Sequence, residues 1–440
     1  YTDIFRENVF LRDAGIYGSK FNEDFLNTRI AEIRFIRAVN YARMIRIFGG
    51  VILRDETNGV DSEGEKAKAR ATEAESWDFV LKDLEFAAKH LPKEWDSKWD
   101  GRLTKGAAYA YMCRTALFAK RWDIAITAAD EIKKLNKYDL MDEYKDVFKV
   151  AGNKEIIFSI AYKIPDMPHY FDRYFAPDGK QGIRRAVPTS ELVDSYDMAD
   201  GTPFSWSGSM AKDPYVGREP RFYLTVMWNR QWYHQAGREV QMMSNEQDGG
   251  PTHDAPQNGY LNRKKVSLEQ NNRNGIHPYR PGILYRLGEA YLNYAEALNE
   301  CDPGNPDILK YLNLIRERAG MPQYGTGKDS NGFDKIPLNG QDEVREAIYH
   351  ERRVELCCEN GLRYLDLRRW KKAEEVLNQP MYGMNFSGTK LSDDPNDDAA
   401  FFKRTQYIKR VYERKFYWYP IYQDQIDKDP TLVQAPFWDK

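Results

Sequence analysis

The chain has 440 residues, enough to bury a large core and to form two or three domains. Its 65 Lys and Arg residues nearly balance its 67 Asp and Glu residues, which leaves a formal net charge of −2. That balance offers no basic field to a nucleic acid or an anionic membrane surface, and no apolar run is long enough to span a bilayer. The chain begins at Tyr1 without an initiator Met or a signal sequence, so we expect a mature or trimmed protein whose targeting signal lies upstream.

The first third of the chain has the apolar periodicity of helices. Residues 30–48 repeat apolar side chains at helical spacing and stop at a Gly-Gly pair. Thr72 is placed to cap a second helix that runs to Leu91-Pro92. Residues 106–119 and 122–135 then form a pair that resembles a tetratricopeptide hairpin, whose repeat is about 34 residues.

A second helical block is predicted to begin near Ile283. Residues 284–298 carry an apolar stripe, and residues 306–319 form the partner helix. Residues 341–360 and 362–377 make one more hairpin. Each hairpin leaves an apolar face uncovered, so we expect about four degenerate units to stack on one another.

These patterns predict a mostly α protein with a tetratricopeptide-like helical-repeat scaffold, long loop-rich insertions and a few short strands. Residues 156–160 and 222–226 have the apolar, β-branched composition of such strands. Loops as long as those around them are usually functional. The predicted organisation is a single domain, 1–440, with helical repeats at approximately 27–140 and 283–378, a loop-rich ligand-side insertion at approximately 155–282, and an irregular C-terminal segment, 379–440.

Charged residues concentrate in the stretch Glu351–Trp370, which otherwise has the pattern of a buried helical hairpin. At 100° per residue, Glu351 and Glu355 fall in the middle of an apolar helix face. Buried carboxylates are costly unless they are paired, and arginines follow closely in the sequence. We therefore predict that these arginines pair with the two glutamates in a structural ion-pair network formed by Glu351, Glu355, Arg363, Asp366 and Arg368.

The same two glutamates could instead be a catalytic pair. A glycosidase needs two carboxyl groups about 5–10 Å apart, and one helical turn separates them by about 6 Å. Nearby arginines, however, lower the pKa of a carboxyl group, whereas an acid catalyst needs a raised pKa. The structural network is the favoured interpretation, and we expect no enzymatic activity.

Other chemical motifs are weak. The acidic loop 393–398 could hold calcium through oxygen ligands, but it lacks the spacing and the glycine of an EF-hand, which favours a solvated loop. The six histidines have no metal-ligand spacing, and no Gly-x-Ser-x-Gly elbow is present. We expect no cofactor, with calcium as the single alternative.

Aromatic residues make up 14% of the chain, and several lie in the loop-rich segment among amide and guanidinium side chains. Such a combination suits a sugar, whose C–H faces stack on rings while its hydroxyl groups form hydrogen bonds. The alternative is that the rings pin long loops to the scaffold. The predicted ligand-binding residues are Trp206, Trp228, Trp232, Tyr233, Tyr279 and Arg280.

Five motifs occur in order along the chain: Ala31–Ala38 followed by Phe48-Gly49-Gly50-Val51, Leu287–Ala297, Leu312–Gly320, Glu351–Trp370 and Tyr419–Pro436. Together they resemble the SusD/RagB family of outer-membrane nutrient-binding lipoproteins of Bacteroidetes. Two departures, Tyr422 where the family often has Pro and Ala435 where it often has Asn, affect only local turns.

The resemblance implies a non-catalytic, lipid-anchored receptor on the cell surface that binds oligosaccharide or polysaccharide and delivers it to a SusC-like TonB-dependent transporter. The helical face would dock the transporter, and the loop-rich side would hold the ligand. The lipidated cysteine would lie upstream of Tyr1. A peptide-binding lid of the RagB type and a repeat adaptor that binds only protein remain open. The family motifs belong to the scaffold, so the ligand-binding residues rest on chemistry alone.

Overall fold

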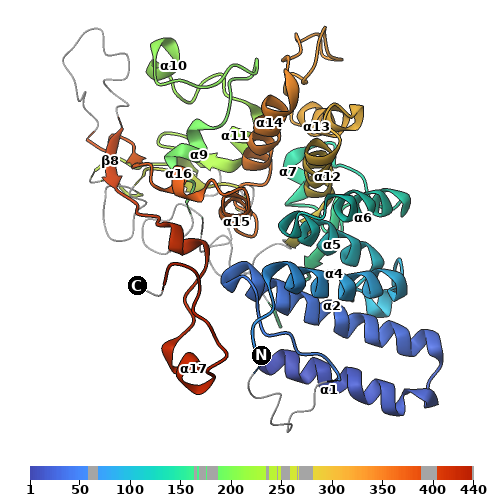
Figure 1. The fold of residues 1–440 in the computed structure, drawn as a ribbon. Helices are drawn as coiled ribbons and strands as arrows, with labels where there is room; N and C mark the ends of the chain where they lie inside the picture. The colour runs from blue at the N-terminus through green and yellow to red at the C-terminus, as the bar shows by residue number, and fades with distance from the viewer. Residues whose placement is uncertain are drawn as a thin grey trace.

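Long helices stack along one side of the molecule, and short helices, strands and loops occupy the other side (Figure 1). The computed structural model describes residues 1–57, 68–162, 166–167, 175, 187–233, 237–244, 246–248, 258–264, 266, 281–387 and 404–438. Tyr279, Arg280 and the acidic loop 393–398 lie outside these residues.

The stacked helices follow one another as antiparallel hairpins. Helix α2 packs between α1 and α4, α5 packs between α4 and α6, and α12 packs on α5, α6, α13 and α14. The predicted mostly helical scaffold is confirmed. Its helices are α1 (Thr2–Tyr17), α2 (Glu23–Phe48), α4 (Glu73–His90), α5 (Lys105–Ala119), α6 (Trp122–Lys134), α12 (Leu287–Cys301), α13 (Pro306–Arg318) and α14 (Gly340–Glu355).

Local sequence signals set several helix ends. Thr72 caps α4 as predicted: its hydroxyl oxygen accepts from the Glu75 backbone N–H at 3.2 Å, and the Glu75 carboxylate accepts from the Thr72 N–H at 2.9 Å. This reciprocal capping box satisfies two donors that the first turn leaves unpaired. At the C-terminal end of α2, Gly49 has a φ of 74°, which glycine adopts without a steric cost.

One apolar core joins the two helical blocks, although more than 150 residues separate α6 from α12 in the sequence. Small side chains permit the close approach, because Ala116 and Ala125 of the first block and Ala295 of the second are completely buried in it. A second core holds α1, α2, α4 and α5 together. The stack is therefore continuous from α1 to α14.

Four two-stranded antiparallel sheets, found in the described residues, pin the remaining segments. They pair β1 (Ile156–Ile160) with β6 (Gly282–Arg286), β2 (Val226–Met227) with β5 (Leu261–Asn262), β3 (Trp232–Tyr233) with β4 (Arg238–Glu239), and β7 (Met381–Gly383) with β8 (Thr405–Ile408). The shorter helices are α7 (Tyr144–Val147), α9 (Ser190–Asp194), α10 (Gly208–Lys212), α11 (Pro220–Thr225), α15 (Leu362–Arg369), α16 (Ala373–Leu377) and α17 (Gln423–Lys428), with 3₁₀ turns η1 (Gly18–Lys20), η2 (Ser97–Trp99) and η4 (Arg414–Tyr417).

Two predicted elements are wrong in type. Residues 222–226 are mostly helix α11, because Pro220 starts the helix and its fixed φ suits a first turn. The second helical block begins at Leu287, since residues 282–286 form β6 and pair with β1. The strand at 156–160 is confirmed as β1.

The hairpin that contains Glu351–Trp370 is shorter than predicted. Helix α14 ends at Glu355, and the chain reverses through Cys358 and Asn360, whose φ angles are 59° and 47°. The predicted helix 362–377 is two helices, α15 and α16, with a break at Lys371, where φ is 60°. Left-handed residues cannot continue a right-handed helix, which explains both breaks.

Candidate functional site: a buried ion network and aromatic side chains

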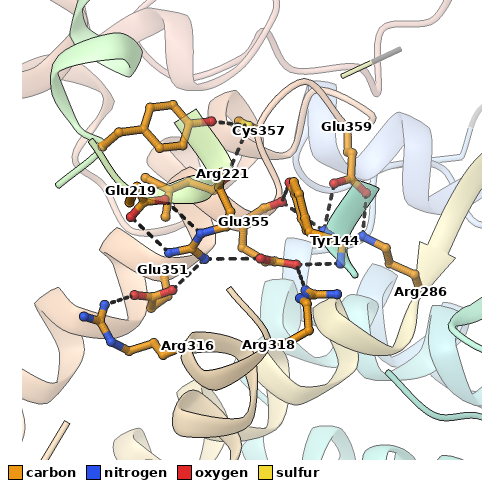
Figure 2. A network of polar contacts seen from close by, with 12 residues as sticks. Tyr144, Glu219, Arg221, Arg286, Arg316, Arg318, Glu351, Glu355, Cys357 and Glu359 are labelled. Carbon is orange, nitrogen blue, oxygen red and sulfur yellow. Dashed lines mark hydrogen bonds and ion pairs between the residues drawn. The ribbon is translucent and has the colours of Figure 1, made fainter. Parts of the chain in front are cut away.

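Helix α14 carries two carboxylates into the interior of the molecule. Glu351 and Glu355 are four residues apart, so they lie one turn apart on the same helix face, and both are 0% exposed. Figure 2 shows the charged side chains that converge on them from other elements.

Arg221 of α11 links the two carboxylates. Its Nη1 lies 2.9 Å from Glu351 Oε2 and 3.2 Å from Glu355 Oε2, and its Nε donates to Glu219 Oε1 at 2.9 Å. One guanidinium thus contacts three glutamates (Figure 2). Its fixed fork of donors suits this arrangement, since each N–H points at a different acceptor.

The end of α13 supplies two more arginines. Arg316 is paired with Glu351 and also donates to the Tyr324 hydroxyl at 3.1 Å. Arg318 is paired with Glu355 and, at 3.0 Å, with Glu155. The two residues therefore join α13 to α14 at successive turns.

The β1–β6 pair delivers the next members. Ile156 and Arg286 are opposite each other in the register, and Arg286 Nη1 lies 2.7 Å from both Glu155 Oε1 and Glu355 Oε1. Arg286 also forms two hydrogen bonds of 2.9 Å with Glu359, which follows α14.

The C-terminal end of α14 is held by donors. The Glu355 carbonyl accepts from the Tyr144 hydroxyl at 2.7 Å, from Arg286 at 2.9 Å and from Lys264 at 3.0 Å. The last carbonyls of a helix lack intrahelical partners and carry partial negative charge, so cations are favourable there. Lys264 also binds Glu359 at 2.6 Å, which closes the network.

Charge is balanced within this network, which we call the α14 ion network. Burial by itself raises the pKa of a carboxyl group, but Arg221 and Arg316 outweigh it and lower the pKa of Glu351 to about 2. Arg286 and Lys264 likewise lower the pKa of Glu359 to about 2 against the effect of burial. The five acids are Glu155, Glu219, Glu351, Glu355 and Glu359, and the five bases are Arg221, Lys264, Arg286, Arg316 and Arg318.

Three of the residues predicted for this network lie elsewhere. Asp366 binds Arg352 at 3.0 Å and Arg369 at 2.8 Å in a second buried cluster. Arg368 donates to the Tyr417 carbonyl, and Arg363 lies 6.0 Å from the Trp370 ring without an ion pair in the described part of the chain. The prediction that the following arginines pair with Glu351 and Glu355 is wrong, because α14 ends early and the reversed chain carries α15 to the η4 side.

The geometry of the two glutamates does not suit acid–base catalysis. Both carboxylates are buried without access to solvent, and their neighbours hold them in the ionised form. A glycosidase acid needs a raised pKa and a cleft that admits the sugar. The arrangement serves to join α11, α13, β6 and α14.

Trp206 belongs to a cluster of stacked polar and aromatic groups. Its Nε1 donates to Asp194 at 3.0 Å, and the Arg404 guanidinium lies 5.0 Å from its ring. The same guanidinium lies 4.8 Å from the Tyr382 ring and is paired with Asp194. The sequence prediction missed Arg404 and Tyr382, although Tyr382 lies in a short apolar run that forms β7.

The other predicted rings differ in exposure. Trp228 is half-buried and packs against both Tyr215 and Phe222, with ring centroids 5.4 and 5.2 Å away. Tyr233 is 2% exposed and packs in the core beside β5, whereas Trp232, its neighbour in β3, is 52% exposed. Adjacent strand residues point to opposite faces, which explains the difference. Tyr233 therefore cannot stack on a ligand in this conformation, and Tyr279 and Arg280 lie outside the described residues.

Comparisons with known proteins give matches to SusD-like families and proteins along most of the chain. A model of the SusD family matches residues 144–438, and a model described as starch-binding, associating with outer membrane, matches residues 1–117. A SusD-like protein of Formosa agariphila is 27% identical over 432 residues, covering 91% of this chain and 74% of the relative.

Solved structures give the same result for the fold. A SusD-like protein of Bacteroides fragilis is 30% identical, with a TM-score of 0.80, and the match covers 98% of this chain and 83% of that one. A SusD-like carbohydrate binding protein of the same species is 24% identical, with a TM-score of 0.78 over 94% of this chain and 81% of that one. The helical stack is the tetratricopeptide-like scaffold of SusD-like proteins.

Loss of one carboxylate should destabilise the fold strongly. Replacing Glu355 with Gln leaves Arg286 and Arg318 with less compensating charge in the interior, so we expect the free energy of unfolding in urea to fall by about 3–5 kcal/mol. Glu375→Gln, on an exposed position of α16, is the control and should change it by less than about 0.5 kcal/mol. A loss below about 1 kcal/mol for Glu355→Gln would contradict the structural role of the network.

Acid should weaken the network in a defined range. The pKa of Glu351 is lowered from 4.5 to about 2, so its stabilising effect is complete above pH 4.5 and is lost as the pH falls towards 2. The loss is on the order of 3 kcal/mol. Burial raises the pKa of Glu219, so its contribution to stability has the opposite pH dependence. The natural chain is therefore compared with Glu351→Gln, in which Glu219 is unchanged. The free energy of unfolding should fall more steeply with decreasing pH for the natural chain than for Glu351→Gln. Equal slopes would refute the assignment of Glu351 to an ion pair in the folded state.

Proposed function

Because this chain belongs to the SusD family, we propose that it binds oligosaccharide or polysaccharide at the cell surface and passes it to a SusC-like TonB-dependent transporter. The molecule divides into a continuous helical scaffold and a loop-rich side, and on the described part of that side Trp232 is exposed and Trp206 is half-buried beside Arg404, which supports the proposal. The relative described as a carbohydrate binding protein supports a glycan as the ligand.

Trp232 is the strongest candidate for stacking on a sugar. Its partner residue in the β3–β4 ladder is Glu239, and the buried neighbour Tyr233 anchors β3 in the core, so the Trp232 ring is carried on a fixed strand. A rigid, half-exposed indole gives a large contact area and loses little conformational entropy on binding.

Trp206, Arg404 and Tyr382 form a second candidate contact surface. The guanidinium lies against both rings, and the Asp194 carboxylate orients Trp206 and Arg404 together. Flat rings beside charged hydrogen-bonding groups match the alternating apolar and polar faces of a pyranose. Trp228 supports this side of the molecule through packing instead, since its ring lies within an aromatic stack.

The transporter and membrane assignments rest on the family. One matching model describes association with the outer membrane. No helix in the described part of the chain has the length and apolar character needed to cross a bilayer. Helix α1 exposes Phe5, Ile16 and Tyr17, which supports docking of a protein partner on the helical face. We propose a lipid anchor as the attachment to the membrane.

Removing the Trp232 ring should weaken glycan binding. We expect Trp232→Ala to lower affinity for a bound polysaccharide by about 1–3 kcal/mol, or roughly 5- to 150-fold, as loss of one stacked ring does elsewhere. The measurement is retardation in gels cast with a panel of polysaccharides that includes starch, followed by calorimetry on those that bind. Trp99→Ala, an equally exposed ring at η2 on the helical side, is the control and should bind normally. Unchanged binding by Trp232→Ala would remove this residue from the site, and binding of peptides alone would replace the glycan proposal.

Bound glycan should remain intact. Because Glu351 and Glu355 are buried and kept ionised, we expect no release of reducing ends when the purified chain is incubated with any polysaccharide that it retains. Release that disappears in Glu351→Gln, with the variant still folded, would establish catalysis instead.

A further inference from the structure

A cavity of about 330 Å³ lies at the seam between the first helical block and the C-terminal part of the chain. Its walls come from α2, α4 and α5 on one side and from α15 and η4 on the other. This volume is at the lower end of the range for small-molecule sites. None of its lining residues belongs to the aromatic groups proposed above to contact a glycan.

The two sides of the seam are fixed to each other. The Tyr419 backbone N–H donates to the Ile47 carbonyl at 2.9 Å, which ties the C-terminal segment to the end of α2. Arg368 donates to the Tyr417 carbonyl, which ties α15 to η4. The cavity is therefore a formed feature of the fold, with walls held in place by hydrogen bonds.

Positive charge lines the cavity in excess. Arg369 is neutralised by Glu296 and Asp366, but the other four basic residues have no ion pair in the described part of the chain. Glu73 is the one acidic residue in the lining. The five basic residues are Arg46, Lys120, Arg368, Arg369 and Lys371.

Arg368 is the clearest sign of a missing partner. It is 8% exposed, yet within the described structure its guanidinium bonds only to the Tyr417 carbonyl, and its Nε has no hydrogen-bond partner. A buried charged group without compensation costs several kcal/mol, whereas the α14 ion network matches every cation with a carboxylate.

The neighbouring cations, Arg46 and Lys371, also indicate that an anionic partner is missing from the cavity. Burial lowers the pKa of Arg46; Tyr111 opposes this effect, and the nearby charges of Arg114, Arg43 and Arg368 lower the pKa further. Burial likewise lowers the pKa of Lys371, and Arg368 and Lys120 add to the effect, while Glu73 opposes it. Groups that repel one another in this way are stabilised by an anion between them.

Aromatic rings complete the lining. Trp77 and Phe118 come from the first block, and Tyr417 and Trp418 from the C-terminal segment. Lys371 Nζ lies 4.7 Å from the Tyr417 ring and 4.6 Å from the Trp418 ring, which holds its charge at the cavity wall. Rings and cations together suit a ligand with a flat or puckered ring and a negative group.

We propose that this cavity binds a small ring compound that carries a carboxylate, with Arg46, Arg368 and Lys371 holding the carboxylate and the aromatic walls contacting the ring. It is a second ligand site, on the scaffold, and it does not depend on the proposed glycan contacts of the loop-rich side.

The test is isothermal titration of the full chain with D-glucuronate, with D-glucose and with sodium sulfate at equal ionic strength. We expect glucuronate to bind with a dissociation constant of about 1 mM or below, sulfate to bind more weakly and glucose not to bind at this site. Arg46→Gln and Lys371→Gln should each weaken glucuronate binding by about tenfold or more, because each removes a charge-assisted contact. Neither residue is fully buried, so both variants should fold, which a thermal unfolding curve checks.

Two controls separate this site from the glycan site. Lys310→Gln removes an exposed lysine of α13 that pairs only with Asp307 among the described residues, and it should leave glucuronate binding unchanged. Trp232→Ala should also leave it unchanged. The proposal is overturned if glucuronate does not bind, if both cavity variants bind it normally, or if sulfate binds as tightly as glucuronate, since the rings then contribute nothing.

Discussion

The buried carboxylates around α14 must be neutralised for this fold to form. Glu155, Arg221, Lys264, Arg286, Arg316 and Glu355 come from segments spread over 200 residues, and none of them could be buried alone at an acceptable cost. The network forms only when the helical stack, the β1–β6 pair and α11 are all in place. It therefore couples the scaffold to the loop-rich side, and it fixes how they meet more than it adds net stability, since a well-packed apolar cluster could be as stable.

This coupling places the loop-rich side, where we propose that a ligand binds, on a fixed helical scaffold. Glu351 and Glu355 of α14 are fully engaged in internal ion pairs, so they are not available to a ligand, and the proposed ligand contacts lie on other side chains, such as Trp232 of β3 and Arg404 next to β8. The seam cavity differs in kind from the α14 ion network. In the seam cavity the basic residues outnumber the acidic ones, and an anion from solution would balance their charge.

Local patterns in the sequence predicted the scaffold well. The Thr72 cap follows from the N-cap preference of threonine, and the alanine-rich faces of α5 and α6 and the burial of Glu351 and Glu355 follow from helical periodicity. The sequence patterns did not predict the partners of these glutamates. Arg221 and Arg316 are distant from them in sequence, and their approach depends on tertiary packing. Residues near in sequence, Arg363 and Arg368, were the wrong candidates once the positive φ of Cys358 and Asn360 ended the helix. The sequence likewise could not predict which aromatic rings are exposed. Trp232 and Tyr233 are adjacent in the chain, and they differ only in the face of a two-residue strand on which each side chain lies.

Glu351 and Glu355 of α14 are ionised partners of buried cations. Titration of the glutamate carboxyl carbons by ¹³C NMR, with Glu351→Gln and Glu355→Gln spectra to identify the resonances, measures this directly. We predict that both side chains remain ionised down to about pH 3, as expected when arginine pairing outweighs burial. A carboxyl group of either residue that titrates above about pH 5 would contradict the claim and would mark that residue as an acid–base group instead.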